Sequence, residues 1–143
     1  MPGNMETDLT KLTLIIKQVA AVDTSADPER WIPQNPLWGH CAVTSLIVQD
    51  YFGGTLWRID LSSIPELSYL RSHYLNVLDT GELVDLTCEQ FSTPLPESLP
   101  FEERSRDSIL SHTDTERRYQ LLKERLDLDH EKSHPTLQTS SPQ

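Results

Sequence analysis

The chain has 143 residues, a formal net charge of −10 and a hydrophobic content of 36%, so it has room for one domain with a modest core. This negative net charge argues against nucleic-acid binding, because proteins that bind the phosphate backbone usually carry a basic surface stripe that displaces counterions. Lysine and arginine form no cluster in the sequence, which makes a role at a membrane surface equally poor.

The N-terminal stretch lacks the features of a signal peptide, since its start is acidic and Lys11, Lys17 and Gln18 interrupt its apolar positions. No apolar run approaches the roughly 18 residues that a membrane-spanning helix needs. The two cysteines, Cys41 and Cys88, do not form a disulfide framework. We therefore expect a reduced, cytoplasmic protein, with a Cys41–Cys88 bridge as the minor alternative.

Residues 8–22 form the first expected helix. Leu9, Leu12, Ile16 and Val19 recur at the three- and four-residue spacing of an amphipathic helix. A loop with three prolines follows, and prolines at this density exclude regular helix.

Residues 41–52, "CAVTSLIVQDYF", form the second expected helix. It begins directly after the helix-breaking "NPLWG" and ends at Gly53 and Gly54, which are a strong C-terminal signal. Apolar residues occur on nearly every side of this helix, so we expect it to be buried at the centre of the domain.

Three strands are expected next, over residues 55–61, 69–78 and 82–87. The last two flank "DTG" at 79–81, which fits a three-residue hairpin loop with Gly81 in the left-handed region.

The C-terminal part begins with a proline-rich segment that leads away from the sheet. Residues 113–126 form a final helix, in which Thr113 and Glu116 match a capping box. The pattern predicts a single compact α+β domain over residues 1–128, with a buried helix on a small antiparallel sheet, and a disordered polar tail over residues 129–143.

Cys41 is placed at the first turn of the most apolar helix. The unpaired N–H groups and the dipole of a helix N-terminus favour the thiolate, which is the reactive form of cysteine. Gly39 permits close approach of a substrate or of the preceding loop. The alternative is ordinary packing, because unreactive cysteines are among the most buried residues.

A thiol nucleophile also needs a base and a group that orients the base. A three-residue loop pairs residue 78 with 82 and brings His73 and Asp85 onto one face of the sheet as diagonal neighbours. A two-residue loop would place them on opposite faces. The hypothesis that Cys41, His73 and Asp85 act together therefore depends on this turn, and without it His73 and Asp85 are an ordinary polar pair.

Other candidates are weaker. "HEKSH" at 130–134 matches the zinc-protease pattern, but it falls in the polar tail with Pro135 directly after it. We expect no metal and no cofactor. His40 is expected at a cleft wall or at the surface, and Trp38 beside the site is a candidate to line a cleft.

The stretches "NPLWGHCAVTSLIVQDYFGG" (35–54) and "SHYLNVLDTGELVDLTCEQF" (72–91) resemble the YunG-like family of small bacterial proteins. The resemblance covers about residues 31–125. The chain differs from the family pattern at His40, where glutamine is usual, and at Leu75, where tryptophan is usual. It keeps the pattern at Asn35, Cys41, His73, Asn76, Asp85, Thr87 and Gln90.

The family carries no assigned biochemical role, so the resemblance alone implies no activity. The order of cysteine on a helix and histidine and aspartate on successive strands is more broadly similar to the papain-like superfamily, which includes transglutaminase-like proteins and deamidases. This similarity implies a papain-like fold for the α+β domain, in which Cys41 attacks a carbonyl carbon, His73 transfers the proton and Asp85 orients the imidazole. It also implies an oxyanion and substrate-binding group, with these side chains: Asn35, Gln34, Trp38 and Asn76.

The leading interpretation is a cysteine-dependent amide hydrolase, deamidase or acyl transferase that acts on a small amide or on a peptide or protein side chain. A non-catalytic module that binds a peptide or small molecule is the second. The third is an acidic interaction protein that engages a basic partner.

Overall fold

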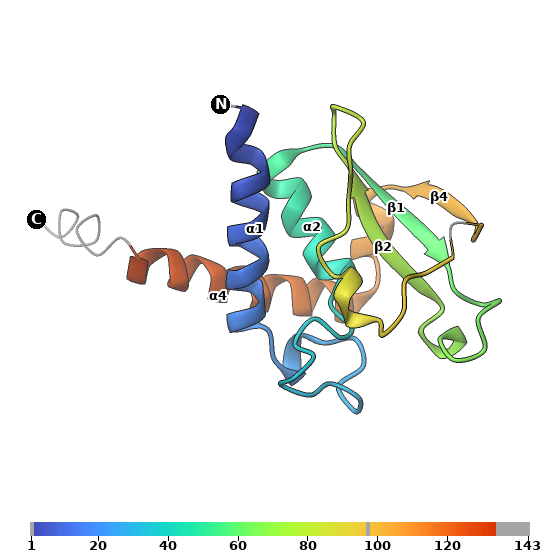
Figure 1. Ribbon diagram of the computed structural model, residues 1–143. Helices are drawn as coiled ribbons and strands as arrows, with labels where there is room; N and C mark the ends of the chain where they lie inside the picture. Colours follow the sequence, from blue (N-terminus) through green and yellow to red (C-terminus); the bar gives the residue numbers. More distant parts are fainter. Residues whose placement is uncertain (1, 97, 134–143) are drawn as a thin grey trace, which may run out of the picture.

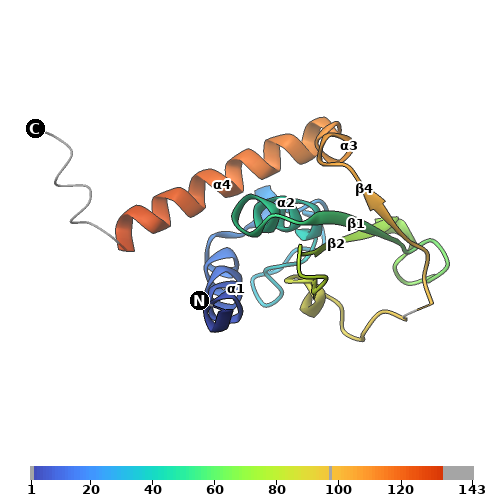
Figure 2. The same cartoon turned by 90° about the horizontal axis from the view of Figure 1, so that it is seen from above.

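The computed structural model describes residues 2–96 and 98–133. Three long helices gather on one side of the molecule and an antiparallel sheet forms the other (Figures 1 and 2). The helices are α1 (Pro2–Val19), α2 (Cys41–Phe52), α3 (Arg106–Leu110) and α4 (Thr113–Ser133). The strands are β1 (Thr55–Asp60), β2 (Ser72–Val77), β3 (Leu83–Val84) and β4 (Phe101–Arg104), with the spatial order β3-β2-β1-β4. The predicted α+β class is confirmed.

The helix α2 has the predicted bounds and lies at the centre of the domain. Its six residues from Val43 to Val48 are all buried. Leu46 and Ile47 belong to a cluster with residues of α1 and α4, such as Ile16 and Leu122. Each fully buried side chain of this size contributes about 1.5–3 kcal/mol, so packing fixes α2 firmly.

The helix α2 ends as the sequence predicts. The N–H of Gly53 donates to the carbonyl of Gln49 at 2.9 Å, and Gly53 has a φ of 74°. The next residue, Gly54, has a φ of 85° and lies against the backbone of Val77, so the chain turns directly into β1.

The hairpin between β2 and β3 has the predicted three-residue loop. Val77 pairs with Leu83, and the N–H of Leu78 donates to the carbonyl of Glu82 at 2.8 Å. Gly81 has a φ of 89°, as the predicted turn requires. The ladder is shorter than expected, since β3 stops at Val84 and the chain then forms a 3-10 turn, η3 (Cys88–Gln90).

The strand β4 and the short helix α3 were not predicted. Phe101 pairs with Ile59 of β1, so the proline-rich segment returns to the sheet instead of leaving it. The ring of Phe101 also stacks on Trp57, with the centroids 4.6 Å apart. This edge strand is held by pairing with a distant part of the chain, which a local sequence pattern does not reveal.

The two terminal helices differ from their predicted bounds. The helix α1 begins at Pro2 and ends at Val19, rather than spanning 8–22. The helix α4 begins at Thr113 as predicted and extends to Ser133, so residues 129–133 are helical. Residues 134–143 of the predicted tail lie outside the described residues.

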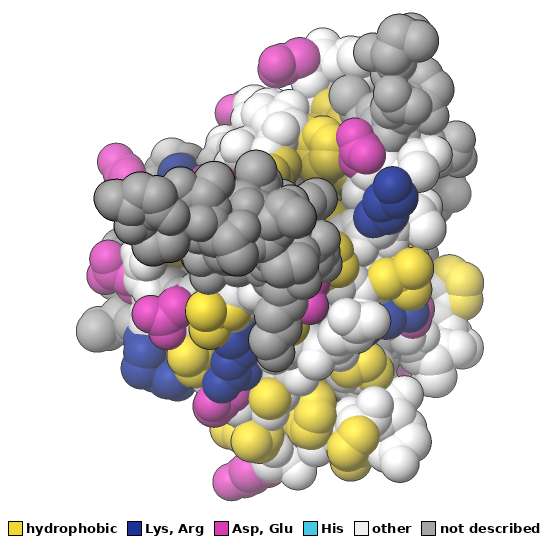
Figure 3. All heavy atoms as spheres, turned by 90° about the vertical axis from the view of Figure 1, so that its left-hand side faces the viewer, with side chains coloured by type: hydrophobic (Ala, Val, Ile, Leu, Met, Phe, Trp, Pro, Cys, Tyr) yellow, Lys and Arg dark blue, Asp and Glu magenta, His cyan; other side chains and the backbone are white. Residues whose placement is uncertain are grey.

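Within the described residues, no helix combines the length and the apolar character that crossing a membrane requires. One face of the molecule is shown in Figure 3, where acidic and basic side chains are interspersed with apolar ones.

Candidate active site

Cys41 is the first residue of α2, and the chain conformation just before it sets the start of the helix. Gly39 has a φ of 75°, in the left-handed region, so the helix cannot extend backward into the preceding loop. The carbonyl of His40 then accepts the first helical hydrogen bond, from the N–H of Thr44 at 2.9 Å. The Cys41 thiol is free and half-buried, beside N–H groups that have no partner within the helix.

His73 lies on β2 and is fully buried. Its Nε2 is 2.7 Å from Oδ2 of Asp85, which follows β3 directly. The hairpin therefore brings these two side chains into contact, as the three-residue loop predicts. Asp85 itself is 17% exposed, so its carboxylate is within reach of solvent while the imidazole is not.

The charge of His73 is set by its neighbours. Burial by itself lowers the pKa of His73, but the hydrogen bond to Asp85 and the nearby Cys41 thiol outweigh it and raise the pKa from 6.5 to about 10. The second ring nitrogen, Nδ1, is buried and has no hydrogen-bond partner among the described residues. The Asp85 carboxylate and the Cys41 thiol therefore both favour the charged form of His73, whose Nε2–H is hydrogen-bonded to Asp85.

Asn35 and Gln34 lie in the loop before α2. The amide of Asn35 donates to the carbonyl of Gln90 at 2.9 Å, which leaves its second N–H for another acceptor. Gln34 is exposed. Both remain in the loop that leads to Cys41.

Trp38 and Asn76 were expected to contact substrate. Trp38 is half-buried, donates its indole N–H to Asp27 at 3.0 Å and packs edge-on against Phe91. Asn76 does not reach the surface: it is 2% exposed, and its amide donates to the carbonyl of Ser45 at 2.9 Å. The structure thus gives Asn76 a contact that joins β2 to α2, because its position on β2 faces that helix.

Gln90 and Phe91 are the neighbours of the site that the residue-by-residue reasoning missed. The Oε1 of Gln90 accepts from the N–H of Gly39 at 2.9 Å, and its Nε2 donates to the carbonyl of Thr87 at 3.1 Å. Gln90 therefore ties the loop before Cys41 to the segment after Asp85. The ring of Phe91 lies edge-on to His73, 5.0 Å away. Their sequence signal is the stretch "DLTCEQF" (85–91), which belongs to the motif that the chain shares with the family pattern.

His40 corrects an expectation. It was expected at a cleft wall or at the surface, but it is fully buried. Its Nδ1 is 2.9 Å from the carbonyl of Trp38, and its Nε2 is 2.7 Å from the hydroxyl of Thr24. The ring points away from Cys41 into the preceding loop, and its role is to hold that loop.

Other chemistry has little support in the described residues. They include no group of three or more His, Cys, Asp or Glu side chains that could hold a metal ion. Cys41 and Cys88 are both free, so the alternative disulfide is absent. The side chains of the zinc-protease-like stretch at 130–134 lie outside the described part of the chain.

The comparisons with known proteins agree on one family. The family model described as "YunG protein" matches residues 8–131. The chain is also 35% identical over 98 residues to "Uncharacterized protein YunG" from Bacillus subtilis (strain 168), covering 66% of this chain and 73% of the relative. No solved structure matches the chain. Since the family model covers most of the chain, the chain belongs to the YunG family.

Proposed function

We propose that the protein is a cysteine-dependent amide hydrolase, deamidase or acyl transferase in which Cys41, His73 and Asp85 act together. One observation carries the proposal: a fully buried histidine binds Asp85 at 2.7 Å through Nε2, while its Nδ1 is unpaired and Cys41 is close enough to raise its pKa. Strongly perturbed titratable groups of this kind cluster at functional sites.

The proposed reaction begins with Cys41 as a thiolate and His73 as an imidazolium. The sulfur attacks the carbonyl carbon of an amide, so a C–S bond forms and the C–N bond breaks. The proton on Nδ1 of His73 goes to the departing nitrogen, which leaves as ammonia or an amine. Water or a second amine then attacks the thioester, gives its proton to His73 and releases the Cys41 sulfur.

Asp85 is assigned a positioning role in this scheme. Its Oδ2 accepts a hydrogen bond from the Nε2–H of His73 throughout, which keeps the ring oriented and stabilises the imidazolium. The carboxylate does not itself take up the proton.

The developing oxyanion needs N–H donors near the sulfur. The backbone N–H of Cys41 belongs to the first turn of α2, where intrahelical partners are lacking. The second N–H of the Asn35 amide is the other candidate, because its first N–H already holds Gln90. The hydrogen bond to Gln90 thus holds the Asn35 side chain in place and leaves one amide N–H to donate to the oxyanion.

The test is the rate at which iodoacetamide alkylates Cys41 across pH, read by mass spectrometry. We expect Cys41 to be alkylated faster in the parent than in His73→Ala at pH 6–7, where an ordinary thiol with a pKa of about 8.5 is almost entirely protonated. Cys88 provides an internal control, because burial raises the pKa of its thiol, so it should lag behind Cys41 in every sample. A Cys41 that behaves like an ordinary thiol in the parent, with no change in His73→Ala, contradicts the proposal.

A non-catalytic binding module is the second candidate. It is favoured by a hollow that Asp85 and Phe91 border, since a ligand site does not require the thiol. If Cys41 is unreactive but small molecules bind, this candidate replaces the first.

A further inference from the structure

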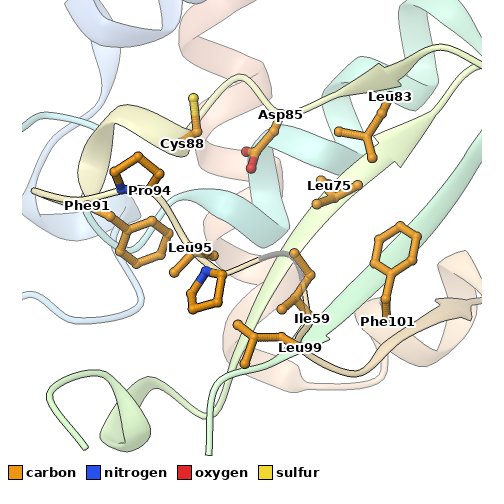
Figure 4. A pocket seen from close by; sticks show the side chains of 11 residues that line it. Ile59, Leu75, Leu83, Asp85, Cys88, Phe91, Pro94, Leu95, Leu99 and Phe101 are labelled. Atoms are coloured by element: carbon orange, nitrogen blue, oxygen red, sulfur yellow. The ribbon is translucent and has the colours of Figure 1, made fainter. Parts of the chain in front are cut away.

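A hollow of about 470 Å³ lies on the side of the sheet that faces away from α2 (Figure 4). Neighbouring residues of a strand point to opposite faces: Asn76 bonds to α2, so Leu75 points into the hollow. Ile59 of β1 and Phe101 of β4 extend the same floor, because they pair directly across the two strands. The opposite wall comes from Phe91, Pro94, Leu95, Pro96 and Leu99.

The lining combines many hydrocarbon side chains with one carboxylate. Of the eleven lining residues, nine are Leu, Ile, Phe or Pro, and the remaining two are Asp85 and Cys88. Ligand sites of small molecules have this volume and this pattern of apolar walls with a few polar groups. In Figure 4 the carboxylate of Asp85 lies among the apolar side chains of the hollow.

Asp85 has capacity for a further hydrogen bond. Its Oδ2 is bound to His73, while the one partner of its Oδ1 among the described residues is the hydroxyl of Thr87, at a long 3.5 Å. An ionised carboxylate accepts several hydrogen bonds, so Oδ1 is available to a donor that enters the hollow.

The hollow is unsuited to anions. None of the described lining residues is Lys, Arg or His, so an anionic ligand would meet the Asp85 carboxylate without a cation in the lining to pair with, because His73 is hydrogen-bonded to the other carboxylate oxygen, Oδ2. The net charge of −10 acts in the same direction, because it attracts cations and repels anions at longer range.

The hollow is distinct from the position of the thiol. Cys41 is not among its lining residues. His73 shares a cross-strand row with Ile59, but the Phe91 ring lies against it and the imidazole is fully buried. A ligand in the hollow therefore meets Asp85 and leaves the Nδ1 side of His73 untouched.

We propose that this hollow binds a small apolar molecule that ends in a protonated amine, with the hydrocarbon part against the sheet and the ammonium group on Oδ1 of Asp85. The site does not depend on the thiol chemistry proposed above. It can therefore be tested in Cys41→Ser, where that chemistry is absent.

The test compares three probes that share one hydrocarbon part: 4-phenylbutylamine, 4-phenylbutanol and 4-phenylbutyrate. Their affinities are measured by isothermal titration calorimetry, and their place by NMR shifts of the amides of Ile59, Leu75 and Leu99. We expect the amine to bind at least tenfold more tightly than the carboxylate, with the alcohol between them. No binding by any probe, or equal binding of amine and carboxylate, overturns the proposal.

Two variants locate the contacts. Asp85→Asn should reduce the advantage of the amine over the alcohol to less than threefold, whereas Asp79→Asn, which removes an exposed carboxylate of the same hairpin, should leave it unchanged. Leu99→Trp should fill the hollow and weaken all three probes at least tenfold while Asp85 stays intact, which keeps the test decisive if Asp85→Asn does not fold. Amine binding that survives Leu99→Trp places the molecule elsewhere and overturns the proposal.

Discussion

His40 precedes Cys41 in the chain and His73 lies close to the Cys41 thiol in the fold; both histidines are fully buried, yet their environments favour opposite charge states. Burial lowers the pKa of His40 to about 4, and its hydrogen bond to the Trp38 carbonyl offsets only part of that effect. Burial also disfavours the charge on His73, but the hydrogen bond to Asp85 and the Cys41 thiol raise its pKa to about 10. A buried imidazole is therefore neutral unless a carboxylate or thiol lies beside it.

The partners of His40 also fix its tautomer. The carbonyl of Trp38 can only accept, so Nδ1 carries the proton and donates to it. Nε2 then accepts from the hydroxyl of Thr24, sixteen residues earlier in the chain. His40 is a neutral clamp on the loop before α2, whereas His73 is a charged group next to the thiol.

The largest expected effect comes from a substitution at Gly39, which should disrupt the packing of the loop that His40 holds. A Cβ at this position would overlap Oγ of Ser25 and come within 2.9 Å of the N of Ala26, and the backbone has a φ of 75°. Ser25 cannot easily move, because its hydroxyl donates to the Trp38 carbonyl at 2.7 Å. We expect Gly39→Ala to lower the free energy of unfolding by about 4 kcal/mol, from left-handed strain and overpacking together.

Gly81→Ala is the matched control for that substitution. Gly81 has a similar φ of 89° but nothing within 4 Å of an added Cβ, so it should lose only the strain, about 1–2 kcal/mol. Urea unfolding of both variants measures the difference. Equal losses of unfolding free energy in the two variants would show that a Cβ at Gly39 does not clash with the loop.

The second expected effect is a change in the free energy of unfolding with pH. His40 determines the change below pH 6.5, the acid limb of the profile, and His73 determines the change above pH 6.5, the alkaline limb. The folded pKa of His40 lies below the unfolded value of 6.5, so between pH 4 and 6.5 the unfolded chain binds a proton that the folded chain does not. Stability should therefore rise by about 3 kcal/mol as pH increases through this window. The folded pKa of His73 lies above 6.5, so its contribution is complete below pH 6.5 and is lost as pH rises toward 10.

The carboxyl and tyrosine groups with shifted pKa values act outside the interval from pH 4.5 to 8.5, and burial raises the pKa of the Cys88 thiol, so it too titrates mainly above this interval. Hydrogen bonds from arginine side chains lower the pKa of Asp23 and Asp114, so their contributions are lost only below about pH 4. Burial raises the pKa of the Tyr51 and Tyr119 hydroxyls, which affects stability only above about pH 10. Urea unfolding at pH 4.5, 6.5 and 8.5 measures both limbs, and His40→Asn should flatten the acid limb alone. A profile that is flat from pH 4.5 to 8.5 would contradict both assignments.

Much of the fold was predictable because its signals are local. Gly53 ends α2, and Gly81 sets the hairpin register, since each adopts a backbone conformation that other residues avoid. That register was sufficient to predict the contact between His73 and Asp85. The strand β4 was missed because it is held by pairing with β1, more than forty residues earlier.

The neighbours of the site were predictable only where sequence order fixes them. The burial of His40 depends on Thr24 and on a loop that folds back over it, and no spacing rule connects those residues. Asn76 was expected at the surface of the site, but its strand position turns it toward Ser45. The hollow combines side chains from four separate segments, so only the folded chain reveals it.

The smallest expected effect is that of Asp85→Asn, which should remove the difference in charge between His40 and His73. In Asp85→Asn the carboxylate that stabilises the imidazolium is gone, and His73 keeps only the burial that lowers its pKa and the Cys41 thiol. We expect the His73 pKa to fall well below about 10, which an NMR titration of the imidazole protons measures, and stability at pH 6.5 to drop by about 2 kcal/mol with the loss of a charged hydrogen bond. The His40 titration should not change, because Asp85 is not among the groups that set its pKa. If His73 still titrates near pH 10 in Asp85→Asn, the thiol holds the charge without the carboxylate, and the role of Asp85 reduces to orientation.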